Sequence, residues 1–152
     1  MKIITDDLSG GAVRALLSGH LAQMQAITPP ESVHALDIDG LLRPDVTVYS
    51  VWEGTDLAGC GALKELDHGH GEIKAMRTAK EYLRKGVAGA VLEHIISRAL
   101  ARGYSRLSLE TGASDDFLPA RSLYAKFGFR ECGPFGSYRD DPNSVFMTKE
   151  LV

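Results

Sequence analysis

The chain has 152 residues and a mass of 16.4 kDa, which predicts a single domain over residues 1–152. Apolar residues make up 44% and charged residues 24%, as in folded globular proteins, and this excludes an intrinsically disordered chain. The 17 basic and 20 acidic residues give a net charge of −3, which argues against a nucleic-acid-binding protein, because phosphate contacts need clustered positive charge.

Cysteine content and hydropathy predict a cytoplasmic protein. Cys60 and Cys132 are too few for a disulfide scaffold, which favours a reducing compartment. No uncharged apolar run approaches the roughly 20 residues of a membrane helix. Residues 1–7 lack the apolar core of a signal peptide. We therefore expect neither a membrane nor a nucleic acid as a partner.

The N-terminal part is predicted to form a strand and two helices. Residues 1–4 are typical of a short strand, and apolar residues at helical spacing over residues 13–24 predict an amphipathic helix. Residues 28–30, Thr-Pro-Pro, end that helix, because proline has no backbone N–H to donate. Residues 32–36 are predicted to form a short second helix with Ser32 as its N-cap.

Three strands joined by tight turns are predicted next. Residues 46–53 are rich in β-branched and aromatic side chains, which favours a strand. The turn at 53–56 leads into a strand at about 57–66, and the turn at 67–71 leads into a strand near 72–78.

The clearest helix signal lies between residues 87 and 100, where apolar side chains form a continuous stripe that Gly103 ends. A strand at 104–111 follows, then a helix over 120–127. Two closing strands are predicted near 129–138 and 144–150. This order predicts an α/β sandwich whose mixed, mostly antiparallel sheet contains a parallel pair, rather than a doubly wound sheet.

The turn before the strongest helix is suited to a diphosphate. Residues 83–90 read Leu-Arg-Lys-Gly-Val-Ala-Gly-Ala, so Arg84 and Lys85 stand beside small residues at a helix N-terminus. The first N–H groups of a helix have no partner within it and attract anions. The alternative is that the small residues serve close helix–sheet packing and the two cations are only solvated. The turn matches neither a Walker A loop nor a dinucleotide fingerprint.

A second motif decides between these alternatives. Residues 120–129, Ala-Arg-Ser-Leu-Tyr-Ala-Lys-Phe-Gly-Phe, resemble the A-x-x-L-Y-x-x-x-G-F signature of the GNAT acetyltransferase superfamily. Gly86-x-Ala88 is similar to the end of that family's acetyl-CoA pyrophosphate motif. The superfamily motifs cover about residues 72–129. A closer resemblance, to a bacterial group of N-acetyltransferases, covers nearly the whole chain; it rests on residues 74–78, 83–88, 107–112 and 141–144.

Two positions depart from the superfamily pattern. Leu83 stands where Gln or Arg is usual, and Phe117 stands where Asn is frequent. The first removes one side-chain contact to the pyrophosphate, for which Arg84 can substitute, and the second removes a polar contact to the pantetheine arm. Neither removes the backbone donors.

The resemblance implies a GNAT fold that binds acetyl-CoA where the strands 72–78 and 104–111 splay apart. The free edge of the first strand would pair with the pantetheine amides. The implied cofactor-binding residues are Met76, Arg77, Thr78, Arg84, Lys85, Gly86, Val87, Ala88 and Gly89.

The implied reaction is direct attack of an amine on the thioester, with acetyl-CoA as co-substrate and no metal. Tyr124 occupies the family's general-acid position; the alternative is an aromatic core residue. Glu72 is the first choice for the base and Glu110 the second, and an exposed charge at a strand end is the alternative for Glu72.

The acceptor side is predicted from position in the fold. Glu31, Ser32 and His34 lie in the connection that covers the acceptor in GNAT folds, although an N-cap and solvated polar residues are the alternative. Tyr138, near the last strands, is a further candidate for substrate binding. The acceptor would be a primary amine on a small molecule or a peptide.

Three histidines receive structural interpretations. His68 and His70 bracket a turn without a third ligand, so we expect a solvated hairpin rather than a zinc site. His20 lies on the apolar stripe of the first helix and is expected to be buried and hydrogen-bonded.

A non-catalytic acyl-CoA-binding or sensing domain is the alternative function on the same fold. Edge strands would permit a homodimer.

Overall fold

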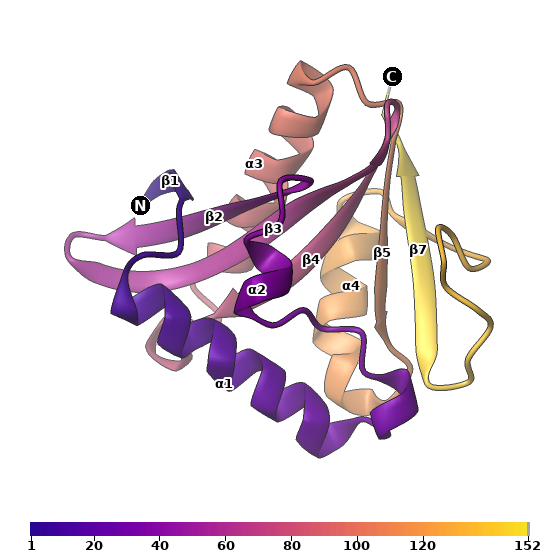
Figure 1. Cartoon of the computed structure of the whole chain (residues 1–152), viewed down its shortest axis with the longest axis horizontal. Helices are drawn as coiled ribbons and strands as arrows, with labels where there is room; N and C mark the ends of the chain where they lie inside the picture. Colours follow the sequence, from indigo (N-terminus) through magenta and orange to yellow (C-terminus); the bar gives the residue numbers. More distant parts are fainter. Residues whose placement is uncertain (152) are drawn as a thin grey trace.

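A seven-stranded sheet forms the centre of the molecule, in the order β1-β2-β3-β4-β5-β7-β6 (Figure 1). The computed structural model describes residues 1–151. The strands are β1 (Lys2–Asp6), β2 (Val46–Glu53), β3 (Asp56–Asp67), β4 (His70–Thr78), β5 (Arg106–Gly112), β6 (Arg130–Cys132) and β7 (Ser144–Glu150). The helices are α1 (Gly11–Ile27), α2 (Ile38–Leu41), α3 (Val87–Ala101) and α4 (Leu118–Lys126), with short 3₁₀ turns η1 (Pro30–Ser32), η2 (Lys80–Tyr82) and η3 (Asp115–Phe117).

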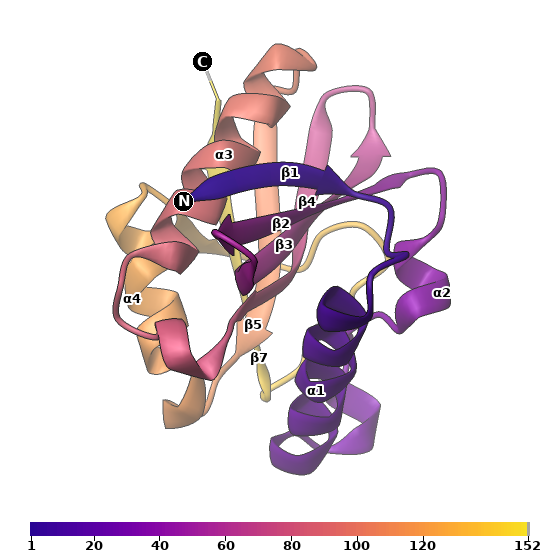
Figure 2. The same ribbon diagram turned by 90° about the vertical axis from the view of Figure 1, so that its left-hand side faces the viewer.

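The helices cover both faces of the sheet. Figure 2 shows α3 and α4 on one side of the strands and α1 and α2 on the other. Two apolar clusters match this division: the larger joins α3 and α4 to the sheet, and the smaller, which includes Val13, Leu17 and Leu41, lies under α1 and α2. The mixed, mostly antiparallel sheet flanked by helices confirms the predicted α/β architecture.

The parallel pair β4–β5 comes apart along its length. Backbone pairing runs from His70–Arg106 to Ile73–Leu109 and then stops, although both strands continue to Thr78 and Gly112. Every other strand pair between residues 1 and 151 is antiparallel. The second half of β4 therefore has unpaired backbone groups on the side that faces β5, and the two strands diverge visibly in Figure 1.

A bulge in β4 adds to this separation. Cys60 of β3 pairs with Arg77 and Ala62 pairs with Lys74, so two residues of β4 stand opposite the single residue Gly61. Ala75 within the bulge has a φ of 55°, in the left-handed region. Because a bulge bends its strand and increases the twist, it turns the end of β4 away from its neighbour.

Close packing of α3 depends on two glycines of β3. A Cβ atom on Gly59 would lie 2.7 Å from Val87 Cγ1, and one on Gly61 would lie 2.6 Å from Val91 Cγ1. The small side chains of the strand therefore bring the apolar stripe of α3 directly onto the sheet backbone. This contact places the N-terminus of α3 beside the end of β4.

Two predicted elements are wrong. In place of a helix at 32–36, the chain forms η1 and then α2, whose N-cap is Asp37, with Oδ1 accepting from the N–H of Gly40 at 2.9 Å. Ser32 is buried and instead donates to Asp141 Oδ2, so it has no capping role. The predicted strand at 129–138 ends at Cys132, because Gly133 and Pro134 follow and proline cannot donate to a ladder.

No helix within the described part of the chain is long and apolar enough to cross a bilayer.

Alanine substitutions at a packed glycine and at an exposed glycine should have opposite effects on stability. Gly61→Ala should destabilise the fold by about 1–3 kcal/mol, because the added methyl group overlaps Val91 and Met76. Gly19→Ala, in the exposed middle of α1 with open space around it, should stabilise the fold by about 0.5–1 kcal/mol. Urea unfolding of both variants measures the difference, and equal stabilities would contradict the packing argument.

Candidate active site

Two connected cavities lie along the gap between β4 and β5. The first, which we call the inner pocket, has a volume of about 230 Å³ and lies between α1, residues 32–35, residues 72–77 of β4 and residues 110–112 of β5. The second, which we call the outer groove, has a volume of about 670 Å³ and runs between α1, the end of β4, the start of α3 and α4. Gln23, Met76, Arg77, Asp116, Ala120 and Tyr124 line both cavities. A long ligand in the outer groove would therefore reach the inner pocket at Met76 and Tyr124.

The start of α3 has the geometry predicted for an anion site. Arg84 and Gly86 have φ values of 61° and 83°, and Gly86 is the N-cap, with no side chain capping the first N–H groups of the helix. The side chains of Arg84 and Lys85 are exposed, and neither forms an ion pair with any residue up to 151. Lys85 Nζ lies 5.4 Å from the ring centroid of Tyr82.

Four of the nine predicted cofactor residues line the outer groove, and the other five lie at the start of α3. Met76, Arg77, Thr78 and Ala88 line the groove. Val87 contributes its side chain to the core, so only its backbone is available at the helix start. Gly86 and Gly89 add no side chain, and a Cβ at Gly86 would meet nothing within 4 Å, which leaves this turn open to a ligand.

Glu72 lies in a buried network of hydrogen bonds. Its residue is 2% exposed, which excludes the alternative of a solvated strand end. Glu72 Oε2 accepts hydrogen bonds from the Tyr138 hydroxyl and from Lys74 Nζ, the latter at 3.2 Å. Lys74 Nζ also donates to Tyr138 Oη at 3.0 Å and to the carbonyl of His34 at 3.3 Å. The ammonium group compensates the buried carboxylate and joins β4 to the loops on both sides of the pocket.

Glu110 also lines the inner pocket, in a different electrostatic environment. Its Oε2 accepts a hydrogen bond from Ser144 Oγ at 2.8 Å, and no cation within residues 1–151 pairs with it. Burial raises the pKa of Glu110 above its usual range, although the Ser144 hydroxyl opposes the rise. Glu72 and Glu110 therefore face one cavity. Glu72 forms an ion pair with Lys74, whereas Glu110 forms none with a described residue, although the charge of Lys74 also opposes the rise of its pKa.

Tyr124 separates the inner pocket from the outer groove. Its side chain belongs to the larger core cluster and meets the Phe129 ring edge-on, with 6.0 Å between centroids. Burial, with a smaller contribution from the negative charge of Glu110, raises the pKa of the phenol. The hydroxyl therefore keeps its proton throughout the neutral range.

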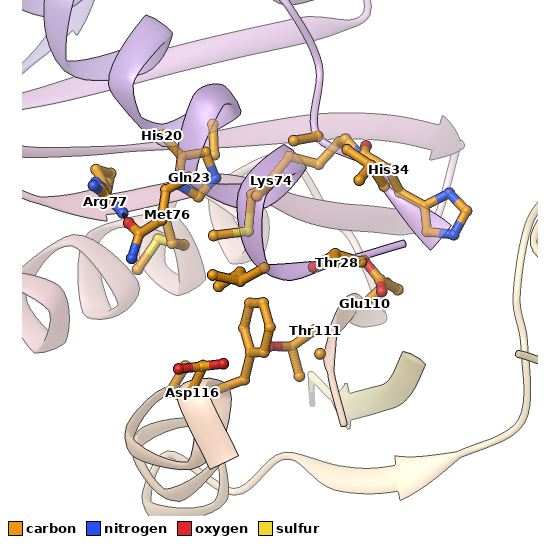
Figure 3. Close-up of a pocket in the computed structure, with 18 of the residues that line it drawn as sticks. His20, Gln23, Thr28, His34, Lys74, Met76, Arg77, Glu110, Thr111 and Asp116 are labelled. Carbon is orange, nitrogen blue, oxygen red and sulfur yellow. Dashed lines mark hydrogen bonds between the residues drawn. The ribbon is translucent and has the colours of Figure 1, made fainter. Parts of the chain in front are cut away.

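The predicted acceptor residues divide into three groups. His34 lines the inner pocket (Figure 3). Its ring meets that of Tyr138 edge-on, with 5.0 Å between the centroids. Tyr138 lies behind the pocket wall, where its hydroxyl holds Glu72. Glu31 is exposed on η1 and does not line the pocket, whereas Ser32 lines it and binds Asp141 and Asn143.

His20 is half-buried and is not hydrogen-bonded as expected. Its Nδ1 is buried and has no hydrogen-bond partner among the residues described. Burial, together with the charge of Arg77, lowers the pKa of His20 to about 4, so the ring stays neutral at physiological pH. The side chain lines the inner pocket beside Gln23 and Met76 (Figure 3).

The hairpin histidines differ from each other. His68 is exposed, as a solvated turn predicts, but His70 Nε2 lies 2.6 Å from Ser108 Oγ and its ring faces Phe135. The strand pairing brings His70 inward, so its expected solvation is wrong. In the described chain no three ligand-type side chains gather where they could hold a metal ion. Burial raises the pKa of the Cys60 thiol to about 12, which makes it unreactive.

Sequence reasoning missed Lys74 as a site residue. Lys74 follows Glu72 by two positions, and this spacing places both side chains on one face of a strand. That signal was present in the sequence. No local sequence pattern indicates that Tyr138 joins the same network, because 64 positions separate it from Lys74.

The model of the Acetyltransferase (GNAT) family matches residues 14–129. The chain belongs to this family. It is 59% identical over 151 residues to the uncharacterized N-acetyltransferase YsnE of Bacillus subtilis, with 99% of this chain and 100% of YsnE covered. It is 53% identical over 149 residues to the uncharacterized N-acetyltransferase YedL of Escherichia coli, with 98% of this chain and 94% of YedL covered.

A solved structure shares the fold. A GNAT family acetyltransferase from Elizabethkingia anophelis, with acetyl-CoA bound, superposes with a TM-score of 0.73 at 22% identity, over 99% of this chain and 97% of that one. Family and relatives together identify this protein as a GNAT acetyltransferase. The expected GNAT membership is confirmed, and so is the closer resemblance to bacterial N-acetyltransferases, here YsnE and YedL.

The uncompensated burial of Glu110 predicts a pH-dependent stability difference. Folding raises the pKa of Glu110 above its value in the unfolded chain, which is about 4.3. The protonated carboxyl therefore stabilises the fold fully at a pH below the unfolded pKa. This stabilisation is lost as the pH rises through the folded pKa and the carboxyl ionises. Glu110→Gln should therefore match the wild type in stability near pH 3.5 and exceed it at pH 7. Denaturant unfolding at both pH values measures this. Lower stability of the variant at pH 7 would contradict it.

Proposed function

We propose that this protein is an N-acetyltransferase that moves the acetyl group of acetyl-CoA to a primary amine of a small molecule or peptide, by direct attack in a ternary complex. The observation that carries the proposal is the meeting of the outer groove and the inner pocket at Tyr124, with Glu72 and Glu110 in the same pocket. A thioester at this junction would have an acceptor cavity on one side and a phenol beside its sulfur.

The cofactor would lie along the outer groove. The pantetheine amides would pair with the free backbone edge of β4 at Met76–Thr78, because pairing with β5 has ended before these residues. The diphosphate would rest on the first N–H groups of α3, where residues 86–89 supply backbone donors and Arg84 and Lys85 supply positive charge. The helix dipole adds to this attraction.

Glu110 is better suited than Glu72 to take the proton of the incoming ammonium. Glu72 Oε2 already accepts two hydrogen bonds and its charge is compensated by Lys74, which favours a supporting role. Glu110 has no cationic partner, and its raised pKa brings it nearer to neutrality, as a general base requires. We therefore place Glu110 first as the base, with Glu72 as the residue that holds Lys74 and Tyr138.

The proton balance closes with Tyr124. The ammonium gives one proton to the base, and the neutral nitrogen then attacks the thioester carbon and forms the C–N bond. The C–S bond breaks, Tyr124 donates its proton to the leaving sulfur, and the second proton of the nitrogen restores the phenol through solvent. The products are an acetamide, free CoA and one released proton. Because burial raises the pKa of Tyr124, its hydroxyl is protonated at neutral pH and has a proton to donate.

Two further expectations stay predictions. The free edges of the sheet are β1 and β6, either of which would permit a homodimer. The two free cysteines, one of them buried, favour the reducing cytoplasm.

The anion site at α3 predicts a selective loss of cofactor affinity. Arg84→Ala/Lys85→Ala should raise the Kd for CoA at least about tenfold, because charge-assisted hydrogen bonds contribute about 1.5–3 kcal/mol each. Isothermal titration calorimetry measures this, with Lys2→Ala/Arg43→Ala as a control that removes two exposed cations elsewhere. Affinity for S-acetylpantetheine, which lacks the diphosphate, should not change. An equal loss for both ligands would count against the assignment.

The acid role of Tyr124 predicts a loss of turnover without a loss of binding. Tyr124→Phe keeps the buried ring and should lower kcat roughly 100-fold or more, while the Kd for CoA stays the same. The control is Tyr82→Phe, which removes a hydroxyl bonded to Asp56 outside both cavities. Steady-state kinetics with a panel of amines gives the answer. CoA binding with no turnover of any amine by the wild type would instead favour a sensing domain.

A further inference from the structure

The inner pocket is lined by a carboxylate, Glu110, that forms no ion pair with any described residue. Arg77 and Asp116, which also form no ion pair there, line the end that the pocket shares with the outer groove. Glu110 lines the pocket with a single hydrogen bond, from Ser144, and without a cation. An uncompensated carboxylate that is largely buried loses hydration free energy, which a bound cation can restore. The pocket therefore favours a ligand with a positively charged group at Glu110.

The lysine of the pocket cannot serve a second anion. An ammonium group has three N–H donors. Those of Lys74 Nζ form hydrogen bonds to Glu72, to Tyr138 and to the carbonyl of His34. Its side chain is 9% exposed. A carboxylate on the ligand would have to displace one of these buried partners, Glu72 above all.

The arginine of the pocket lies at the opposite end. Figure 3 shows Arg77 beside Gln23 and His20, well away from Glu110 and His34. The Arg77 guanidinium donates to Gln23 Oε1 and also lines the outer groove. Lys74 and Arg77 are the lysine and arginine residues among the pocket's described lining. A carboxylate next to the ammonium at Glu110 would thus find no free cation within reach.

Apolar side chains cover the pocket from α1 and the segment after it. Met24, Ile27 and Val33 line the cavity together with Phe117 and Ala120. The volume of about 230 Å³ is below the 300–1,000 Å³ that is common for drug-sized ligands. The cavity therefore suits a short apolar stem behind a charged head.

We infer that the acceptor is a small primary amine on an apolar alkyl or arylalkyl stem, with no carboxylate beside the amine. This inference rests on the proposed N-acetyltransferase function. It excludes free α-amino acids as preferred acceptors, because their carboxylate would meet the negative charge of Glu110 while the ammonium of Lys74 is already paired with Glu72.

The test compares acceptors that differ in one group. The wild-type enzyme is assayed with isoamylamine against L-leucine and with phenethylamine against L-phenylalanine, by release of free CoA and mass spectrometry of the product. Assays are run at about pH 8, at which ordinary histidine side chains are neutral, and rates are compared per concentration of unprotonated amine. L-Leucinamide, with a neutral group of the same size as the carboxylate, separates charge from bulk.

The inference predicts that kcat/KM for each carboxylate-free amine exceeds that of its amino acid at least about tenfold, and that leucinamide falls on the side of isoamylamine. Equal or better use of the amino acids would overturn it, and so would leucinamide behaving like leucine. A clear preference for a peptide that begins with leucine would overturn the small-molecule assignment. If no amine is acetylated although CoA binds, the proposed function itself fails, and the inference fails with it.

A second measurement does not depend on turnover. In the presence of CoA, isoamylamine should raise the melting temperature of the wild type and should not raise that of Glu110→Gln. Thr28→Lys places a new cation on the pocket lining and should shift the preference toward leucine. The opposite shift would contradict the charge argument.

Discussion

The whole site depends on the point at which β4 and β5 stop pairing. Backbone hydrogen bonds join the two strands up to Ile73 and Leu109 and no further. Beyond that point the edge of β4 keeps donors and acceptors that the protein does not satisfy, and the bulge at Ala75 bends the strand away. The close contact of α3 with Gly59 and Gly61 fixes the helix N-terminus beside this edge. One interruption of the sheet thus creates both the groove and the pocket.

The two pocket carboxylates show how the same residue type takes different properties from its surroundings. Glu72 is the more buried, yet it is compensated, because Lys74 and Tyr138 saturate one of its oxygens. Glu110 accepts a hydrogen bond from Ser144, and burial raises its pKa. A paired carboxylate holds the pocket walls together, whereas an unpaired one is available for a substrate cation and its proton.

Local patterns predicted most of the fold. The strand at 46–53 and the helix that starts at 87 were predicted at their observed positions, because β-branched runs and an unbroken apolar stripe leave little choice of conformation. The predictions failed where a contact distant in sequence prevailed over a local preference. Ser32 looks like an N-cap in sequence but binds Asp141, and the strand after Phe129 ends early because Pro134 cannot extend a ladder.

The sequence by itself determined the family and the order of the elements, since these are encoded in short contiguous motifs such as Gly86-x-Ala88 and residues 120–129. Only the tertiary structure decided which pocket carboxylate forms an ion pair. Glu72, Lys74 and Tyr138 meet through strand pairing and a loop that returns 64 positions later, and Glu110 meets Ser144 in the same way. Charge compensation is a property of neighbours in space, and no local pattern in the chain specifies those neighbours.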